Sequence, residues 1–529
     1  MRTRLLTTGA RPIHPPEPTT AHARAVVHGA ARVLRANWTG ASTVPSRRLY
    51  PHQWSWDSAF VAIGLRHLDP ARARRELRSL FAAQWDDGRV PHIVFHPDVP
   101  EGAYFPGPGF WRSSTAGAAH GAPRTAETSG IVQPPVHALA AWLVHLSDPA
   151  GSEREGFLAA LHRPLLAWQR YLTEVRDLGG GGLASIVHPW ESGMDNSPAW
   201  DAPLARVAPA DPDGFRRADL DHGAACDRPT DLDYGRYVAL AAAYRDAGYD
   251  DRSADASPRF AVEDPGLNAL LVASDHALAD IAEALGRDAS THRAQAAART
   301  EALHRRLWDE RTGLFHARDL HDDRLLPARG AAGLLPLVVP GLPAATADRL
   351  HRTLTGPHFR LGAGCRMVPS HDLLAPEYDA ARYWRGPAWF NIAWLVERGL
   401  RLHGARRTAD DLRTAAVTAA AGSGFAEYLD PRSLGAHGAR DFAWTAALAV
   451  DLATAVLAER GAATPAVPTT AAHPTAPAAP AARAAGGPDL PHPRTPDGPD
   501  AHTDARPLQL VHREAPVTVG VTDQRSLPP

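Results

Sequence analysis

Apolar residues recur along most of the chain at the three- and four-residue spacing of an amphipathic helix. Leu77, Leu80 and Phe81 share one face of such a segment, as do Val26 and Ala30 of another. The pattern predicts twelve helices and no convincing pair of strands. The expected helices cover 20–37, 57–68, 70–85, 134–147, 156–177, 233–248, 264–286, 288–308, 344–355, 388–402, 409–421 and 442–459.

The connections between these helices differ in length. If neighbouring helices run antiparallel, alternate connections open at the same end of the bundle. At one end we expect 38–56, 86–133, 178–232, a tight turn near 287, 356–387 and 422–441, and five of these six are long. At the other end the connections are mostly short, except 309–343. Long loops in a compact domain are usually functional.

This arrangement predicts an all-α fold, an (α/α)6 toroid (six-hairpin barrel) whose funnel opens on the side of the long loops. The alternative all-α architecture is a solenoid, which would need a sequence repeat of fixed period, and the chain shows none. Residues 461–529 contain 14 Pro and no Phe, Trp or Tyr, so they are expected to form a disordered tail. Residues 1–19 resemble a short flexible arm, which leaves 20–460 as the folded domain.

Charge and cysteine usage narrow the class of protein. The chain has 56 Lys and Arg against 58 Asp and Glu, without a basic stripe, so neither nucleic acid nor a membrane is an expected partner. Cys226 and Cys365 have no metal-ligand spacing. Because the sequence has no signal peptide and no membrane-spanning run, we expect a cytoplasmic protein.

The long loops combine aromatic residues with carboxylates. The segments are YPHQWSWDSAF from Tyr50, HPWESGMDNSPAWD from His188, YWRGPAWFNIAW from Tyr383, and GFAEYLDP from Gly424. A fifth, TSGIVQPP, contributes Gln133. Such loops suit a site that stacks against sugar rings.

Two loop acids, Asp195 and Glu427, could perform glycoside hydrolysis, which needs a protonated carboxyl and a second carboxylate. Trp190 and Met194 would wall Asp195 and raise its pKa, as suits an acid at neutral pH. Other interpretations exist for each acid. Asp195 or Asn196 could form an Asx turn before Pro198, Glu427 could be a surface acid beside a turn, and Asp57 could cap a helix.

Taken together, these motifs resemble the mannosylglycerate and glucosylglycerate hydrolases of glycoside hydrolase family sixty-three and related inverting (α/α)6 enzymes. The segments above, together with VPH and DFAWTAAL, occur in the family's order over about 50 to 450. The resemblance implies that Asp195 is the general acid and Glu427 the general base. It also implies substrate-binding roles for Tyr50, Trp54, Trp56, Asp57, His92, Gln133, Trp190, Tyr383, Trp384 and Trp389.

Within the same resemblance, Arg228 and Tyr234 match positions that hold the glycerate carboxylate. The long Gly/Pro-rich stretch 98–127 and the segment PRSLGAHG depart from the family pattern, which affects substrate identity more than chemistry. The 14 Trp divide accordingly. Trp54, Trp56, Trp190, Trp384 and Trp389 are assigned to the funnel, Trp142, Trp168, Trp308, Trp394 and Trp444 to helix packing, and the other four to neither.

We therefore expect an inverting, exo-acting α-glycosidase for a small α-glucoside or α-mannoside such as glucosylglycerate or mannosylglycerate. Its carboxyl groups should lie about 6.5–9.5 Å apart, and no metal or cofactor is expected. The partner is a small glycoside, and the sequence does not indicate an oligomeric state. The alternatives are a trehalase-like or glucan-debranching α-glucosidase on the same fold, and a sugar-binding protein without catalysis.

Overall fold

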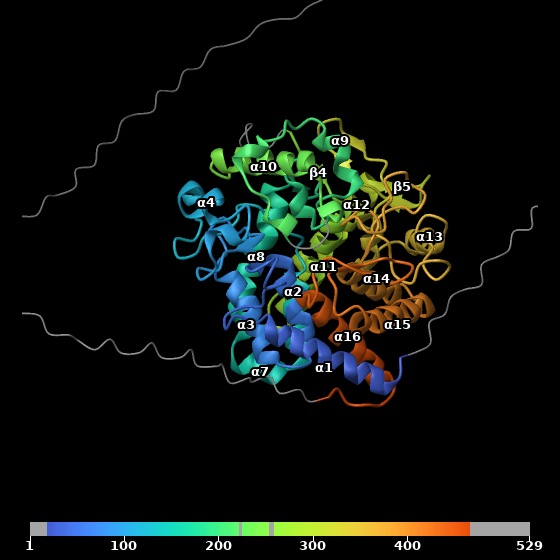
Figure 1. Cartoon of the computed structure of the whole chain (residues 1–529). Coiled ribbons are helices and arrows are strands. Elements are labelled where there is room, and N and C mark those ends of the chain that lie inside the picture. The colour runs from blue at the N-terminus through green and yellow to red at the C-terminus, as the bar shows by residue number, and fades with distance from the viewer. Residues whose placement is uncertain (1–17, 222–224, 253–258, 466–529) are drawn as a thin grey trace, which may run out of the picture. The chain divides into compact units, whose positions relative to one another are not determined.

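Twelve helical elements form two concentric rings in the computed structural model, which describes residues 18–221, 225–252 and 259–465 (Figure 1). The inner ring consists of α2 (Ser55–Leu65), α6 (His137–Ser147), α11 (Pro265–Ala284), η9 (Ala331–Val338), α14 (Phe390–Leu402) and α16 (Ala443–Glu459). The outer ring consists of α1 (Thr20–Ala36), α3 (Pro70–Phe81), α8 (Phe157–Arg170), α12 (Ser290–Leu307), α13 (Ala344–Thr355) and α15 (Arg406–Gly422). Each inner element packs on the next, and α16 closes the ring against α2. The predicted (α/α)6 toroid is thereby confirmed.

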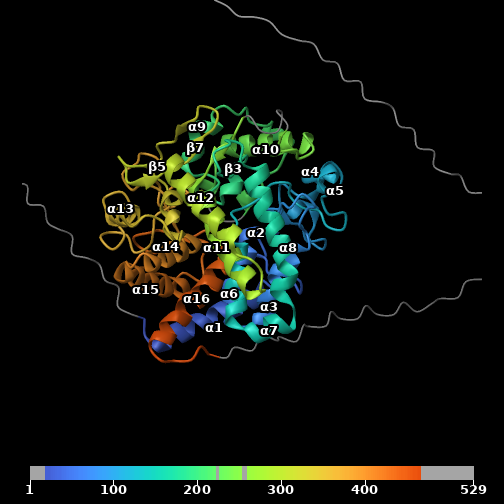
Figure 2. The same cartoon turned by 180° about the vertical axis from the view of Figure 1, so that it is seen from behind.

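Sequence composition explains which helices lie inside. Every residue of α2 is buried, and α16 is apolar on nearly its whole circumference, as expected of a helix that is surrounded by others. By contrast, α3 and α13 bury one face only. The first and the last of the described helices in chain order, α1 and α16, lie side by side in both views (Figures 1 and 2).

One predicted ring position is wrong. Segment 233–248 does form a helix, α10 (Asp231–Asp246), but α10 packs on the short helices α4 (Pro108–Trp111) and α5 (Ser113–Ala116) outside the ring. The twelfth ring element is instead η9, a 3-10 helix that contains Pro336, so α11 follows α6 in the inner ring and η9 lies between α11 and α14. Because Pro336 interrupts the 3.6-residue pattern, periodicity did not reveal a ring element inside 309–343.

Correcting that position makes the loop arrangement regular. The outer-to-inner connections are 37–54, 82–136, 176–264, 308–330, 356–389 and 423–442, and all are long. The inner-to-outer connections, 66–69, 148–156, 285–289, 339–343 and 403–405, are short. The turn near 287 therefore belongs to the short end, contrary to the prediction. Connection 148–156 contains α7 (Pro149–Arg154), and loop 176–264 contains α9 (Asp201–Leu204). A π-helical turn, Tyr171–Val175, continues α8.

Two-residue strands, which the sequence pattern did not predict, join the long loops to one another. One sheet pairs β1 with β2, a second has the order β11-β10-β9, a third β3-β4-β7-β8, and a fourth pairs β5 with β6. All pairs are antiparallel. The strands are β1 (Gln53–Trp54), β2 (Ile93–Val94), β3 (Ser185–Ile186), β4 (Val262–Glu263), β5 (Trp308–Asp309), β6 (Leu314–Phe315), β7 (Arg318–Asp319), β8 (Arg324–Leu325), β9 (Ala388–Trp389), β10 (Tyr428–Leu429) and β11 (Ala436–His437).

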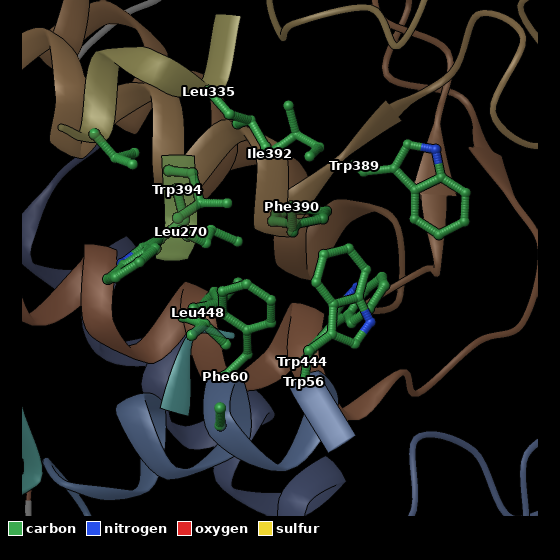
Figure 3. Close-up of a cluster of buried hydrophobic side chains, with 14 of the residues drawn as sticks. Trp56, Phe60, Leu270, Leu335, Trp389, Phe390, Ile392, Trp394, Trp444 and Leu448 are labelled. Carbon is green, nitrogen blue, oxygen red and sulfur yellow. The ribbon is translucent and has the colours of Figure 1, made fainter. Parts of the chain in front are cut away.

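The core lies inside the inner ring. Figure 3 shows Phe60, Phe390, Trp394 and Leu448 converging there from α2, α14 and α16. Of the helices described, none is long and apolar enough to cross a bilayer. Apart from residues 18–19 and 461–465, the predicted N-terminal arm and C-terminal tail lie outside the described residues, so the division into arm, domain and tail stays a prediction.

Candidate active site

A single pocket at the long-loop end is lined by every residue that the sequence singled out. The space between its walls, open mouth included, is about 810 Å³. The predicted residues in its wall are Tyr50, Trp54, Trp56, Asp57, His92, Gln133, Trp190, Asp195, Arg228, Tyr234, Tyr383, Trp384, Trp389 and Glu427. Five of the long loops and the first turn of α2 supply them.

Glu427 is buried and held in one orientation. It directly precedes β10, and its carboxylate accepts hydrogen bonds from Tyr50 Oη at 2.9 Å, the Ala439 backbone N–H at 2.9 Å and Arg228 Nη2 at 3.4 Å. A Cβ at Gly438, where φ is +66°, would lie 2.5 Å from Glu427 Oε2, so the backbone can approach the carboxylate only with glycine there. With 1% exposure, Glu427 is not the surface acid of the alternative interpretation.

Asp195 differs from Glu427 in its surroundings. Burial, with smaller contributions from the charges of Glu427 and Asp219, raises its pKa to about 7, so the carboxyl is partly protonated near neutral pH. Within the described residues, no other side chain donates a hydrogen bond to its carboxyl group. The Asx-turn interpretation does not hold. The Ser197 backbone N–H donates to the Met194 carbonyl at 3.0 Å rather than to Asp195, and the Asn196 side-chain carbonyl accepts from the Trp384 backbone N–H at 2.9 Å.

Asp57 is a third buried carboxyl in the pocket wall. It lies in the first turn of α2, where the N-cap is Trp54 and no side chain caps the helix, so Asp57 is not the capping residue. Burial raises its pKa well above the ordinary value, and the charge of Glu427 adds to the effect. A carboxyl that faces the pocket at this depth can bind sugar hydroxyls.

Two ion pairs, one buried and one partly exposed, hold the Asp195 loop against its neighbours. Arg176 donates two hydrogen bonds of 2.7 Å to Glu191, which also accepts from the Val187 and Val132 backbone N–H groups. Arg385 makes a second bidentate pair with Asp201. These contacts join the Asp195 loop to the Gln133 loop on one side and to the Trp384 loop on the other.

Aromatic side chains form much of the pocket wall. Trp384 and Trp389 stack with centroids 3.9 Å apart and planes 3° apart, and Trp389 stacks further on Tyr428 at 4.7 Å. Trp444 meets Trp56 edge to face at 5.5 Å, and Figure 3 shows the two side by side. Because Trp444 also lines the pocket, its assignment to helix packing alone was wrong. Stacked indoles provide flat apolar surfaces for a sugar ring.

Arg228 connects Glu427 to Tyr50 and Tyr383 in the pocket wall. Its guanidinium donates to Tyr50 Oη at 2.9 Å and lies over the Tyr383 ring at 4.9 Å. Tyr50 and Tyr383 in turn share a 3.2 Å hydrogen bond. Tyr234 donates to the Phe105 backbone carbonyl at 2.8 Å, so its hydroxyl can still accept a hydrogen bond but its proton is not available to a ligand carboxylate.

Gln133 and His92 lie at the inner wall. The Gln133 side-chain carbonyl accepts from the Trp56 backbone N–H at 3.1 Å, which fixes the amide at the start of α2. Burial lowers the pKa of His92 to about 3, so its imidazole is neutral and can donate or accept a hydrogen bond. The His92 ring stacks on Trp190.

The sequence missed several residues of the pocket wall. Tyr104 and Phe105 come from the stretch 98–127, which lacks any periodic pattern. Gly193 also lines the pocket, and a Cβ at this position would lie only 2.4 Å from the Trp56 ring. The remaining missed residues are Pro45, Asp219, Pro229, Phe442 and Trp444. Among the His, Cys, Asp and Glu side chains of 18–221, 225–252 and 259–465, no three gather as metal ligands would.

A family model and named relatives with similar sequences point to the same class of enzyme. The family model described as "Mannosylglycerate hydrolase MGH1-like glycoside hydrolase domain" matches residues 50–445. A mannosylglycerate hydrolase from Rubrobacter radiotolerans is 40% identical over 82% of this chain and 98% of its own length. A glucosylglycerate hydrolase from Mycolicibacterium hassiacum is 37% identical, over 80% and 96%.

A solved structure agrees with these relatives. The crystal structure of a GH63 mannosylglycerate hydrolase from Thermus thermophilus, in complex with Tris and D-glycerate, superposes with a TM-score of 0.73 at 37% identity. It covers 80% of this chain and 99% of the other. The chain therefore belongs to the MGH1-like mannosylglycerate hydrolase family and is a glycoside hydrolase.

Proposed function

We propose that this enzyme hydrolyses α-linked glycosides of glycerate, glucosylglycerate or mannosylglycerate, with inversion at the anomeric carbon. The observation that carries the proposal is the contrast between two carboxyls in one pocket. Asp195 has a pKa of about 7 and no partner side chain among the described residues, whereas Glu427 accepts three hydrogen bonds. Two carboxyls whose environments differ in this way suit acid and base roles.

In the proposed reaction, Asp195 donates its proton to the glycosidic oxygen as the bond to the anomeric carbon breaks. Glu427 accepts a proton from a water molecule, whose oxygen attacks the opposite face of the sugar. A separation of about 6.5–9.5 Å between the two carboxyl groups leaves room for that water. Asp57 and the stacked indoles of Trp384 and Trp389 would bind the sugar ring.

We propose glycerate as the aglycone because the pocket wall contains a cation that could bind its carboxylate. Arg228 is buried, lines the wall and keeps a planar guanidinium that can bind a carboxylate. Relatives named as mannosylglycerate and glucosylglycerate hydrolases, and the D-glycerate bound in the Thermus thermophilus structure, support this choice.

A direct assay tests the proposal. Incubation with glucosylglycerate and mannosylglycerate should release free sugar, and proton NMR at early times should show the β-anomer first, because attack opposite to the α-linkage inverts the centre. Release of the α-anomer would contradict inversion. Absence of release from both glycosides would contradict the substrate class.

A neutral substrate such as trehalose is the principal alternative, and Arg228 separates it from the glycerate glycosides. Arg228→Ala should lower kcat/KM for a glycerate glycoside by about 100-fold or more, because a buried carboxylate loses its cation. Since Arg228 also contacts Glu427 and Tyr50, turnover of an aryl α-glycoside should fall too, but by less. The ratio of the two effects is the measurement. Arg216→Ala, an exposed arginine of the same loop, is the matched control, and equal losses on both substrates would favour the neutral alternative.

A further inference from the structure

We infer that Asp219 accepts a hydrogen bond from the free hydroxyl of the leaving group and thereby selects glycerate over acids that lack this hydroxyl. The inference rests on the proposed function and adds a specificity-determining residue to it. Asp219 lies in a loop with no periodic pattern and was not among the residues predicted from the sequence. In the structure its carboxylate lines the pocket together with Asp195 and Arg228.

Arg217 holds the Asp219 carboxylate in place but leaves part of its hydrogen-bonding capacity free. Arg217 Nε and Nη2 donate to its two oxygens at 3.1 and 2.6 Å. A carboxylate has about four lone-pair sites, so two stay available to a hydroxyl donor from the pocket. The side chain is 16% exposed, and Asp219 lines the pocket.

Asp219 and Arg228 belong to one rigid scaffold. Arg217 also donates to the Pro229 carbonyl at 2.8 Å and to Asp231 at 2.9 Å, and its guanidinium lies 4.4 Å from the centre of the Tyr234 ring. Because Pro229 adjoins Arg228, the anion at Asp219 and the cation at Arg228 are fixed relative to each other. The pocket therefore presents a negative and a positive group beside the acid candidate.

A glycerate linked through its 2-hydroxyl carries two matching groups. Its carboxylate would bind Arg228, and Asp219 would repel that carboxylate, so only the free 3-hydroxyl can approach Asp219 favourably. This places the leaving group in a single orientation next to Asp195. A site built to hydrogen-bond a substrate hydroxyl rejects the analogue without it, because the buried polar group is left unpaired.

The decisive comparison uses the same sugar linked to D-glycerate or to D-lactate, which has a methyl group in place of the hydroxymethyl group. Wild type should prefer the glycerate glycoside by about 10- to 100-fold in kcat/KM, the usual effect of one hydrogen bond to a charged group. In Asp219→Ala this preference should fall to a few-fold, and Asp219→Asn, which keeps an acceptor, should lie between. Free D-glycerate should also inhibit wild type more strongly than free D-lactate.

Asp231→Asn is the matched control, because it removes the other acid partner of Arg217 from an exposed position outside the pocket wall. Its preference for glycerate should equal that of wild type. An unchanged preference in Asp219→Ala, an equal loss in Asp231→Asn, or no preference in wild type would each overturn the inference while leaving glycerate-glycoside hydrolysis intact. Failure of wild type on both glycosides would contradict the proposed function and the inference with it.

Discussion

Asp195→Asn is expected to lower kcat for a glycerate glycoside by about 10²- to 10⁴-fold, the usual contribution of a general acid. Asparagine has nearly the shape of aspartic acid but no proton that it can transfer to the departing oxygen. Within the described residues no side chain bonds to the Asp195 carboxyl, so the melting temperature should stay close to that of wild type. Initial rates of sugar release and a thermal unfolding curve measure both quantities.

The leaving group distinguishes loss of an acid from loss of structure. A nitrophenolate departs without protonation, so the penalty of Asp195→Asn should shrink strongly on a nitrophenyl α-glycoside. The pH profile provides a second measurement. Because the acid must be protonated, wild-type kcat/KM should fall as the pH rises through about 7, the pKa of Asp195, and this alkaline limb should disappear in the variant. Equal losses on both substrates would argue against the acid role.

Glu427→Ala is expected to lower kcat by a similar factor, about 10²- to 10⁴-fold, for a different reason. Without the carboxylate, no group removes the proton from the attacking water. The truncation also leaves room beside the anomeric carbon for a small anion. Azide needs no deprotonation, so adding it should restore turnover and produce a β-glycosyl azide that NMR identifies.

Two controls make that result interpretable. Glu427→Gln keeps the side-chain volume and should be equally inactive but not rescued, since its amide fills the space that azide would use. Glu301→Gln, an exposed acid on α12, should keep wild-type activity. An α-glycosyl azide, or a Glu427→Ala enzyme that turns over at the wild-type rate, would contradict the assignment of the base.

The helical toroid could be predicted because the hydrophobic pattern within most of its helices is enough to identify them. α3 and α13 have one apolar stripe, which periodicity reveals, and α2 and α16 are mostly apolar runs without proline. η9 escaped because Pro336 and a length of eight residues remove the periodic signal. α10 has that signal but packs outside the ring, and only tertiary contacts distinguish the two cases.

The residues of the pocket wall could likewise be predicted only where the local sequence has a recognisable pattern. Residues in recognisable motifs, such as Asp195, Arg228 and Glu427, all line one pocket, and their roles stay predictions. Tyr104 and Asp219 were missed because they lie in loops without pattern, where the backbone path decides what reaches the pocket. Trp444 was misplaced because one side of its ring packs in the core while another faces the pocket, which a helical repeat cannot reveal.

The closure of the inner ring by α16 has a consequence for synthesis of the protein. During translation α1 and α2 leave the ribosome first, yet the helix that both pack against is the last of the described helices to be made. Until then one side of α2, apolar throughout, has no neighbour to cover it. Such sequence-distant contacts slow folding, so we expect the nascent chain to depend on protection from aggregation until its final helix docks.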